Sequence, residues 1–243
     1  MYFYEMEASG EIESDAIVGG VNLSLAHYYS LEFSNNEISE AMLDYLGGYS
    51  QYKTDIIKYI GDAAGEITNE YYYDNAFTAD MVLNILDYLY THSEDFEEQL
   101  EHMLAAQPDE YLEGGELDCE IAQKYGYETY DGTLHVAVAG IVYADEPFLL
   151  AILTRTSYGA VTAMGELCDA FAAWDAQRVN GLKSAVPAPE DASDVPKEEP
   201  ADHAPDINAC REVLSRFVAG VCAVSPLPAG APWQEMFSMA LER

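Results

Sequence analysis

A lysine within an apolar strand pattern is the first feature of this sequence that could do chemistry. Lys124-Tyr125-Gly126 places a cation beside a glycine in an otherwise apolar run. A strand lysine that faces a cleft can hold a ligand carboxylate, and glycine lets a ligand approach the backbone closely. A lone Lys-x-Gly is weak evidence, because Lys124 could equally reach from a sheet edge to solvent.

A second polar group, Ser34-Asn35-Asn36, lies between two helical patterns. The Ser34 hydroxyl could cap the following helix. Ser34 lies 90 residues before Lys124, so only the fold can bring the two together. We expect the helical segment Asn22–Gln107 to pack so that Ser34 approaches Lys124.

The chain offers no evident nucleophile or metal site. Its one Ser-x-x-Lys, Ser50-Gln51-Tyr52-Lys53, follows Gly47-Gly48, and we interpret Ser50 as a helix cap. The four cysteines have no CxxC spacing and the five histidines form no HExxH, so we expect neither a metal nor a cofactor.

The charge balance excludes some partners. The 243 residues carry 44 Asp and Glu against 10 Lys and Arg, a formal net charge of -34. Such a chain repels the phosphates of nucleic acids and anionic membrane surfaces. The acidity fits solubility or a salty habitat better than an acidic binding role. No apolar run is long enough to span a bilayer, and no export signal is evident.

The apolar patterns predict an α+β domain. A mostly helical half precedes three strands and a helix, and Asp62–Ala76 is expected to be a loop. The strands should form an antiparallel meander, because turn residues separate them. Their expected ranges, followed by that of the helix, are Cys119–Tyr127, Leu134–Tyr143, Phe148–Thr154 and Tyr158–Trp174.

The composition changes near the end of that helix. We divide the chain into a domain at 1–175, an acidic Pro- and Ala-rich linker at 176–206 and a short helical tail at 207–243. Within the tail, Ile207–Val224 and Trp233–Leu241 are the expected helices. The tail is too small to fold alone, so it either docks on the domain or binds a partner.

The order of these motifs resembles that of the serine β-lactamase and penicillin-binding-protein superfamily, and of class A β-lactamase-like serine hydrolases in particular. Those enzymes carry Ser-x-x-Lys, Ser-x-Asn and Lys-Thr-Gly in chain order. Here Ser34-Asn35-Asn36 and Lys124-Tyr125-Gly126 match the second and third. The resemblance covers about Met1–Trp174. It implies an antiparallel sheet with a helical subdomain, lacking the N-terminal part.

The resemblance implies two catalytic residues. Ser34 matches the serine that relays a proton toward the leaving nitrogen, and Lys124 matches the lysine that acts on that serine and attracts the substrate carboxylate. The substrate class would be a β-lactam or a cell-wall peptide amide. The family typically acts outside the cytoplasm, so localisation stays open for a chain without an export signal.

It also implies a substrate-binding set. Asn36 would hold the substrate amide, and Gly126 would keep the strand open. The backbone N–H of Tyr127 would form half of an oxyanion hole. Tyr125 stands where the family has Thr or Ser, and its bulkier phenol could still donate to a carboxylate.

Two departures limit the activity that we expect. The motif at Ser50 comes after Ser34, whereas the family's nucleophile comes before it; Met1–Gly10 resembles the second half of the nucleophile helix, so that motif would lie upstream of Met1. Glu66 and Glu70 lack the Glu-x-x-Leu-Asn spacing of the deacylating loop. We therefore expect either an inactive or nearly inactive serine hydrolase domain, or a non-catalytic module that binds a cell-wall peptide or a protein. The oligomeric state stays open.

Overall fold

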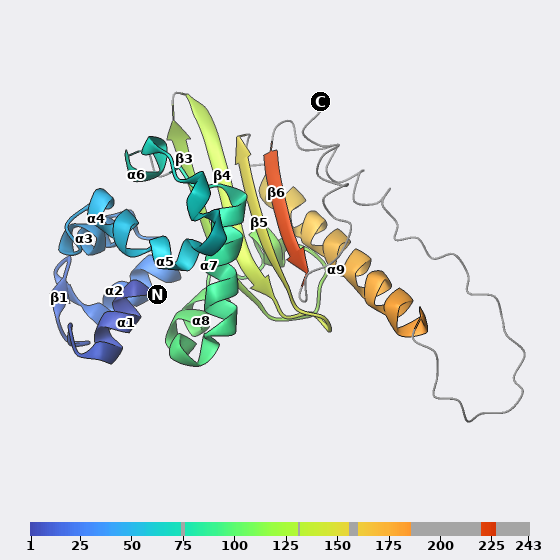
Figure 1. The fold of residues 1–243 in the computed structure, drawn as a ribbon, viewed down its shortest axis with the longest axis horizontal. Helices are drawn as coiled ribbons and strands as arrows, with labels where there is room; N and C mark the ends of the chain where they lie inside the picture. Colours follow the sequence, from blue (N-terminus) through green and yellow to red (C-terminus); the bar gives the residue numbers. More distant parts are fainter. Residues whose placement is uncertain (74–75, 131, 156–159, 186–219, 227–243) are drawn as a thin grey trace, which may run out of the picture.

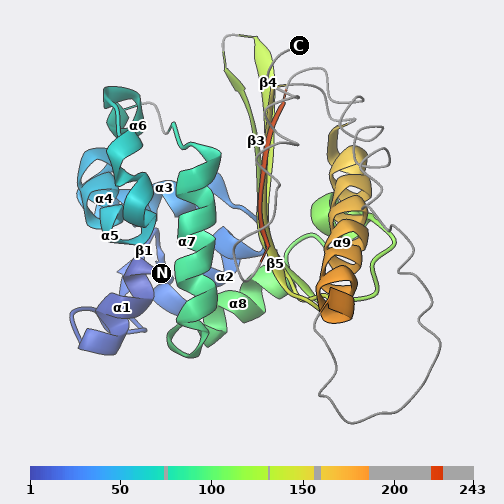
Figure 2. The same ribbon diagram turned by 45° about the vertical axis from the view of Figure 1, so that its right-hand side comes forward.

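A four-stranded antiparallel sheet between two helical layers forms the centre of the fold. The computed structural model describes residues 1–73, 76–130, 132–155, 160–185 and 220–226. Figures 1 and 2 show helix α7 on one face of the sheet and helix α9 on the other. The α+β class and the antiparallel sheet expected from the sequence are confirmed.

The sheet has the strand order β3-β4-β5-β6. Its first three strands form the expected meander, and Lys124 on β3 pairs with Ala139 on β4. Gly132 has a φ of 74°, which suits glycine, in the tight turn between β3 and β4. The strands are β3 (Ile121–Tyr130), β4 (Thr133–Val142), β5 (Phe148–Arg155) and β6 (Gly220–Pro226).

Strand β6 corrects the expectation for the tail. The helix expected at Ile207–Val224 is wrong over residues 220–224, because Gly220–Pro226 forms a strand that pairs antiparallel with β5, with Cys222 opposite Ile152. Periodicity cannot separate helix from strand in a short apolar run, and β5 offers that run an open row of backbone donors and acceptors. Residues 186–219, with most of the expected linker, and 227–243, with the second tail helix, lie outside the described residues.

Helix α9 is longer than expected. It spans Ala160–Ala185, whereas the sequence predicted Tyr158–Trp174 and a linker from residue 176. The extension contains Gln, Arg, Leu, Lys and Ala, which have good helix propensity, and the first proline comes at 187. The change to an acidic, proline-rich composition therefore placed the expected end of the helix about ten residues before its end at Ala185.

The remaining helices precede β3. The segment Asp62–Ala76, expected to be a loop, contains η1 and α6, and Tyr71 of α6 is 1% exposed in the core. Isolated short helices are only marginally stable, so such tertiary contacts decide whether they form. The helices are α1 (Tyr2–Ser9), α2 (Leu23–Leu31), α3 (Asn36–Tyr45), α4 (Tyr49–Asp55), α5 (Ile57–Ile60), η1 (Gly61–Glu66), α6 (Asn69–Tyr73), α7 (Ala79–Thr91), η2 (Ser93–Asp95), α8 (Glu97–Leu104) and η3 (Tyr111–Gly114); β1 (Ile17–Val18) and β2 (Val21–Asn22) form a small hairpin.

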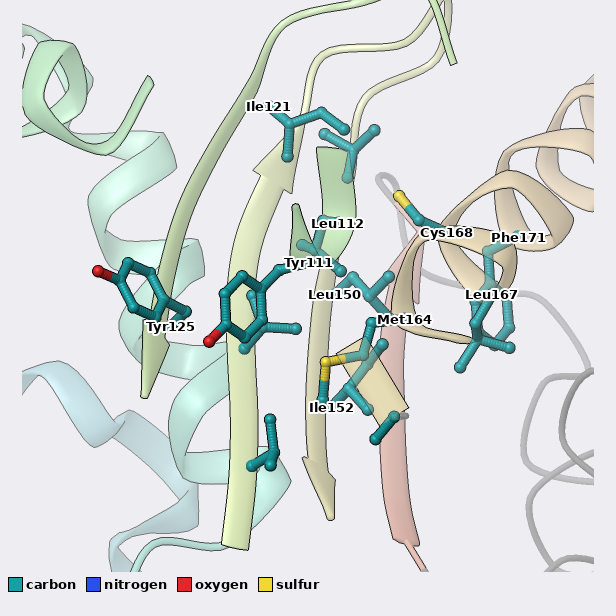
Figure 3. Close-up of a cluster of buried hydrophobic side chains, with 14 of the residues drawn as sticks. Tyr111, Leu112, Ile121, Tyr125, Leu150, Ile152, Met164, Leu167, Cys168 and Phe171 are labelled. Atoms are coloured by element: carbon teal, nitrogen blue, oxygen red, sulfur yellow. The ribbon is translucent and has the colours of Figure 1, made fainter. Parts of the chain in front are cut away.

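Both faces of the sheet are buried. On one face, side chains such as Leu150 pack against α9 and η3, as Figure 3 shows. On the other face, Leu149 packs against α7 and α8. Both leucines are fully buried, so β5 lies in the hydrophobic core on its two sides and reads as a continuous apolar run.

Helix α9 is tied to the segment that leads into β3. The Asp169 carboxylate accepts hydrogen bonds from the backbone N–H groups of Glu116, at 2.9 and 3.0 Å, and Leu117, at 3.2 Å. Gly165, one turn earlier on α9, packs directly against the backbone of Gly114 and Gly115. The absence of a side chain at Gly165 allows this close approach.

We predict that Gly165→Ala destabilises the protein. In a free helix this change would stabilise by about 1 kcal/mol, but here the new methyl group would overlap the backbone at 114–115. The net loss should be about 1–3 kcal/mol in the free energy of unfolding, measured by urea denaturation. Equal or greater stability of the variant would show that the helix can move away from this segment.

Candidate functional site

The structure brings Ser34 and Lys124 into direct contact. Lys124 Nζ donates to Ser34 Oγ at 2.7 Å and to the backbone oxygen of Tyr125 at 2.8 Å. Both Ser34 and Lys124 are half-buried. Among the described side chains, no carboxylate forms an ion pair with Lys124. The amine therefore has neutral acceptors and no counter-ion there.

Alternation along β3 sends successive side chains to opposite faces. Ala122 packs with α7 and α8. Lys124 lies on the same side of the sheet, toward the helical layer formed by α1 to α8. Gln123 and Tyr125 point to the other side. The Gln123 amide is fully buried and bonds the backbone of 106–112, with its Nε2 donating to Ala106 O at 3.0 Å and its Oε1 accepting from Leu112 N at 3.0 Å. This anchoring holds the segment between α8 and η3 against β3.

The position of Tyr125 corrects one expectation. Its side chain is 7% exposed, its ring stacks on Tyr111 with centroids 4.7 Å apart, and its hydroxyl accepts from Gln107 Nε2 at 2.9 Å. Figure 3 shows the two tyrosine rings together in the core. The phenol is thus part of the packing against η3, and it does not present itself to a ligand beside Ser34. Tyr125 contacts Lys124 through its backbone carbonyl, and the centroid of its ring lies 4.7 Å from Lys124 Nζ.

Ser34 sits in a tight turn between α2 and α3. Its φ is 49°, a conformation that costs a non-glycine residue of order 1–3 kcal/mol. The turn is held on both sides, because Asn35 N donates to Tyr29 O at 3.0 Å and Asn35 Oδ1 accepts from Ile38 N at 2.9 Å. Asn35, and not Ser34, is therefore the N-cap of α3. The Ser34 hydroxyl is left to contact Lys124.

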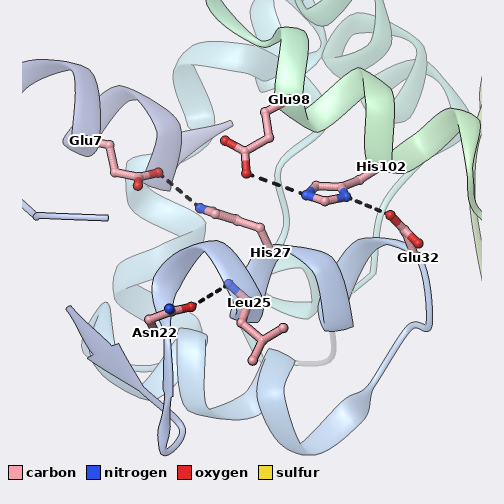
Figure 4. A network of polar contacts seen from close by, with 7 residues as sticks. All are labelled: Glu7, Asn22, Leu25, His27, Glu32, Glu98 and His102. Carbon is pink, nitrogen blue, oxygen red and sulfur yellow. Dashed lines mark hydrogen bonds and ion pairs between the residues drawn. The ribbon is translucent and has the colours of Figure 1, made fainter. Parts of the chain in front are cut away.

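A set of histidine–glutamate contacts braces the same turn. His102 on α8 bonds Glu32, two residues before Ser34, through Nδ1 at 2.8 Å, and its Nε2 lies 3.6 Å from Glu98 (Figure 4). Nearby, His27 bonds Glu7 at 3.2 Å, and burial lowers the pKa of His27 to about 3. His27 is therefore neutral near pH 7 and ties α1 to α2 without carrying charge.

Burial lowers the pKa of Lys124 to about 8. Removal of the amine from water penalises its charged form, while the hydrogen bonds to Ser34 and to the Tyr125 carbonyl favour that form. Lys124 is thus charged at pH 7 but can give up its proton with less cost than a solvent-exposed lysine. A lysine in this state can bind an anion and can also exchange a proton with Ser34.

We predict that Ser34→Ala and Ser34→Gly both lower the pKa of Lys124 below about 8. Each variant removes a hydrogen-bond acceptor from the charged amine, which leaves desolvation less opposed. ¹³C NMR of reductively methylated protein would follow the titration. Ser34→Gly should be about 1 kcal/mol more stable than Ser34→Ala, because glycine adopts the positive φ without strain. An unchanged titration would show that the contact does not influence the charge of Lys124.

The other sequence candidates have different surroundings. Asn36 is the first residue of α3 and is exposed. Gly126 faces open space, since a Cβ there would meet nothing within 4 Å. Tyr127 is 57% exposed and, by alternation, lies on the face of Tyr125. Of the candidate residues, Ser34 and Lys124 therefore contact each other through their side chains. Asn36 is exposed and Gly126 has open space beside it.

Lys124 also lines a cavity of about 520 Å³ within the helical layer. Its walls come from α1 to α5, α7, α8 and β3, and they are mainly aromatic and aliphatic; Tyr52, Phe77 and Met42 are examples. None of the described lining residues is Asp or Glu. The sequence analysis did not find this cavity, because its lining residues are scattered through the first half of the chain and look like ordinary core positions.

The Ser-x-x-Lys at Ser50 does not form a paired site. Ser50 is exposed on α4, whose N-cap is Gly48 and not Ser50 as expected, whereas Lys53 is fully buried. Lys53 Nζ lies 3.4 Å from the ring centroid of Phe77 and 4.5 Å from that of Tyr71, without a hydrogen-bond partner among the described residues. Burial lowers the pKa of Lys53 to about 7. The Ser50–Lys53 segment therefore matches a nucleophile motif in sequence spacing but not in the positions of its side chains.

We predict that Lys53 makes the stability depend on pH. The unfolded chain holds the proton of Lys53 up to about pH 10.4, whereas the folded protein loses it above about 7, so unfolding takes up a proton between these values. The free energy of unfolding should therefore rise with pH between 7 and 10 in the native protein. Lys53→Met should be the more stable protein at pH 7, and the gap should narrow toward pH 10. A constant difference across this range, in denaturation at several pH values, would contradict a depressed pKa.

Metal binding and membrane insertion were also considered for the described part of the chain. No group of three or more His, Cys, Asp or Glu side chains in it is arranged to hold a metal ion. Its helices include none that is both long and apolar enough to cross a membrane. Glu70, considered as a loop acid, is exposed on α6.

No protein-family profile matches the chain, and no curated protein is significantly similar to it. Among solved structures, the chain is similar to the extended-spectrum β-lactamase TLA-3, with a TM-score of 0.48 and 15% sequence identity over 64% of each chain. The chain thus spans less than two thirds of that protein, and a match at this level carries no argument about site or substrate.

Proposed function

We propose that this chain is a β-lactamase-like serine hydrolase domain that binds a carboxylate-bearing amide, either a β-lactam or a cell-wall peptide, at Ser34 and Lys124. In this form it binds without turnover. The proposal rests on the order of the Ser-x-Asn and Lys-x-Gly motifs in the sequence and on one structural observation. That observation is the 2.7 Å contact between Lys124 Nζ and Ser34 Oγ.

The contact between Lys124 and Ser34 leaves each side chain with a hydrogen-bond donor for a ligand. Because Ser34 Oγ accepts from Lys124, its own O–H remains able to donate to a ligand. Lys124 uses two N–H groups on Ser34 and the Tyr125 carbonyl, which leaves a third for a carboxylate. A cationic centre that lacks a counter-ion among the described side chains attracts an anion, even in a chain of net charge -34.

We expect no turnover because the described residues form no paired nucleophile and base. The chain's one Ser-x-x-Lys separates an exposed serine from a buried lysine, so Lys53 cannot act as base for Ser50 in this arrangement. Ser34 would relay a proton in the family's reaction, and this role needs a nucleophile and an acyl group to act upon. Binding is therefore the activity that the described residues support.

A non-catalytic binding module is the second candidate. The position of Tyr125 favours it, because the family's Thr or Ser at this place would hydrogen-bond the substrate carboxylate, whereas the Tyr125 side chain is packed in the core. Such a module would use the same cationic centre for a cell-wall peptide or for a protein partner.

We predict that a fluorescent penicillin binds reversibly and that Lys124→Ala abolishes the binding. Loss of the amine removes the carboxylate contact, while the melting temperature should remain nearly unchanged because Lys124 forms no described ion pair. Fluorescence anisotropy would measure affinity, and mass spectrometry would test for a covalent adduct. Arg155→Ala, which removes an exposed cation from β5, is the matched control and should bind like the native chain.

Two outcomes would count against the proposal, and a third would decide between the two candidate functions. A stoichiometric adduct on any serine would overturn the claim of inactivity. Equal affinity in Lys124→Ala would show that the lysine is not the carboxylate site. Binding of an uncross-linked cell-wall peptide but not of penicillin, with the same dependence on Lys124, would favour the binding module.

A further inference from the structure

The cavity beside Lys124 has a composition that restricts its ligand. It measures about 520 Å³, which is within the range of small-molecule sites, and its walls are mainly apolar. Asp and Glu make up 44 of the 243 residues, yet none of the described lining residues is acidic. An apolar chamber without acidic side chains accepts an anionic ligand more readily than the acidic surface around it would.

Four other polar side chains of the lining are engaged with the protein, whereas the buried Tyr4 hydroxyl has no hydrogen-bond partner among the described residues. Ser30 and Ser39 share a hydrogen bond at 2.8 Å, and Ser39 also bonds the Asn35 carbonyl. His27 is neutral and bonded to Glu7. Gln99 donates to Met103 Sδ at 3.9 Å. Lys124 is the lining side chain with charge and a remaining donor, so a ligand's anionic group would be placed at that wall.

We propose that this cavity binds the apolar body of an amphipathic monocarboxylate whose carboxylate lies against Lys124 and Ser34. This inference rests on the proposed carboxylate site and adds the substrate class: a ligand with one anionic end and an aliphatic or aromatic body. Apolar contact with Tyr52, Phe77, Met42 and Leu43 would supply most of the affinity, and the carboxylate would fix the orientation.

Straight-chain monocarboxylates test the inference by isothermal titration calorimetry. Butyrate, hexanoate and octanoate, each below its micelle concentration, should bind progressively more tightly, by roughly fourfold for each methylene buried. Octanol should bind more weakly than octanoate. Lys124→Met should remove that difference but keep the dependence on chain length, whereas the control Arg155→Met should change neither.

Variants that fill the cavity provide the opposite test. Met42→Trp should abolish the dependence of affinity on chain length; Leu43→Trp is the second variant should Met42→Trp not fold by circular dichroism. Equal affinities along the native series, or an undiminished gain from chain length in both filled variants, would overturn the cavity assignment. Binding of octanoate by the native chain, without binding of penicillin or of an uncross-linked cell-wall peptide, would instead contradict the proposed hydrolase-like function, so the two failures are distinguishable.

Discussion

The position of β3 between two buried faces is the constraint on which the candidate site depends. Side chains alternate across the sheet, so a one-residue slip would move Lys124 into the core against α9 and Tyr125 into the helical layer. The register that pairs Lys124 with Ala139 prevents this, and the buried amide of Gln123 supports it from the opposite side. An edge strand thus carries a cationic side chain toward the helices while its neighbours hold the strand to the rest of the protein.

Two lysines show how the same desolvation leads to different chemistry. Burial depresses the pKa of both, to about 8 for Lys124 and about 7 for Lys53. Lys124 retains two hydrogen-bond acceptors and borders a cavity, so its charge remains available to a ligand. Lys53 is enclosed by aromatic rings without an acceptor among the described residues, so its charge is a cost to stability. The two lysines therefore differ less in the size of the pKa shift than in two other properties. These are the accessibility of the amine to a ligand and the presence of hydrogen-bond acceptors around it.

The turn at Ser34 concentrates several interactions on one hydroxyl. The Asn35 cap, the His102–Glu32 contact and the Ser30–Ser39 hydrogen bond all fix α2, α3 and α8 around it. These contacts offset the unfavourable φ of Ser34.

The sequence by itself determined the local features. Turn residues and apolar runs predicted β3, β4 and β5, and motif order selected Ser34 and Lys124. Only the tertiary structure decided that 220–226 is a strand, that Tyr125 lies in the core, that Asn35 rather than Ser34 caps α3, and that scattered aromatic residues enclose a cavity. The reason is physical: caps and turns depend on neighbours in the chain, whereas strand pairing, side-chain burial and cavities depend on groups that are distant in sequence and meet only when the chain folds.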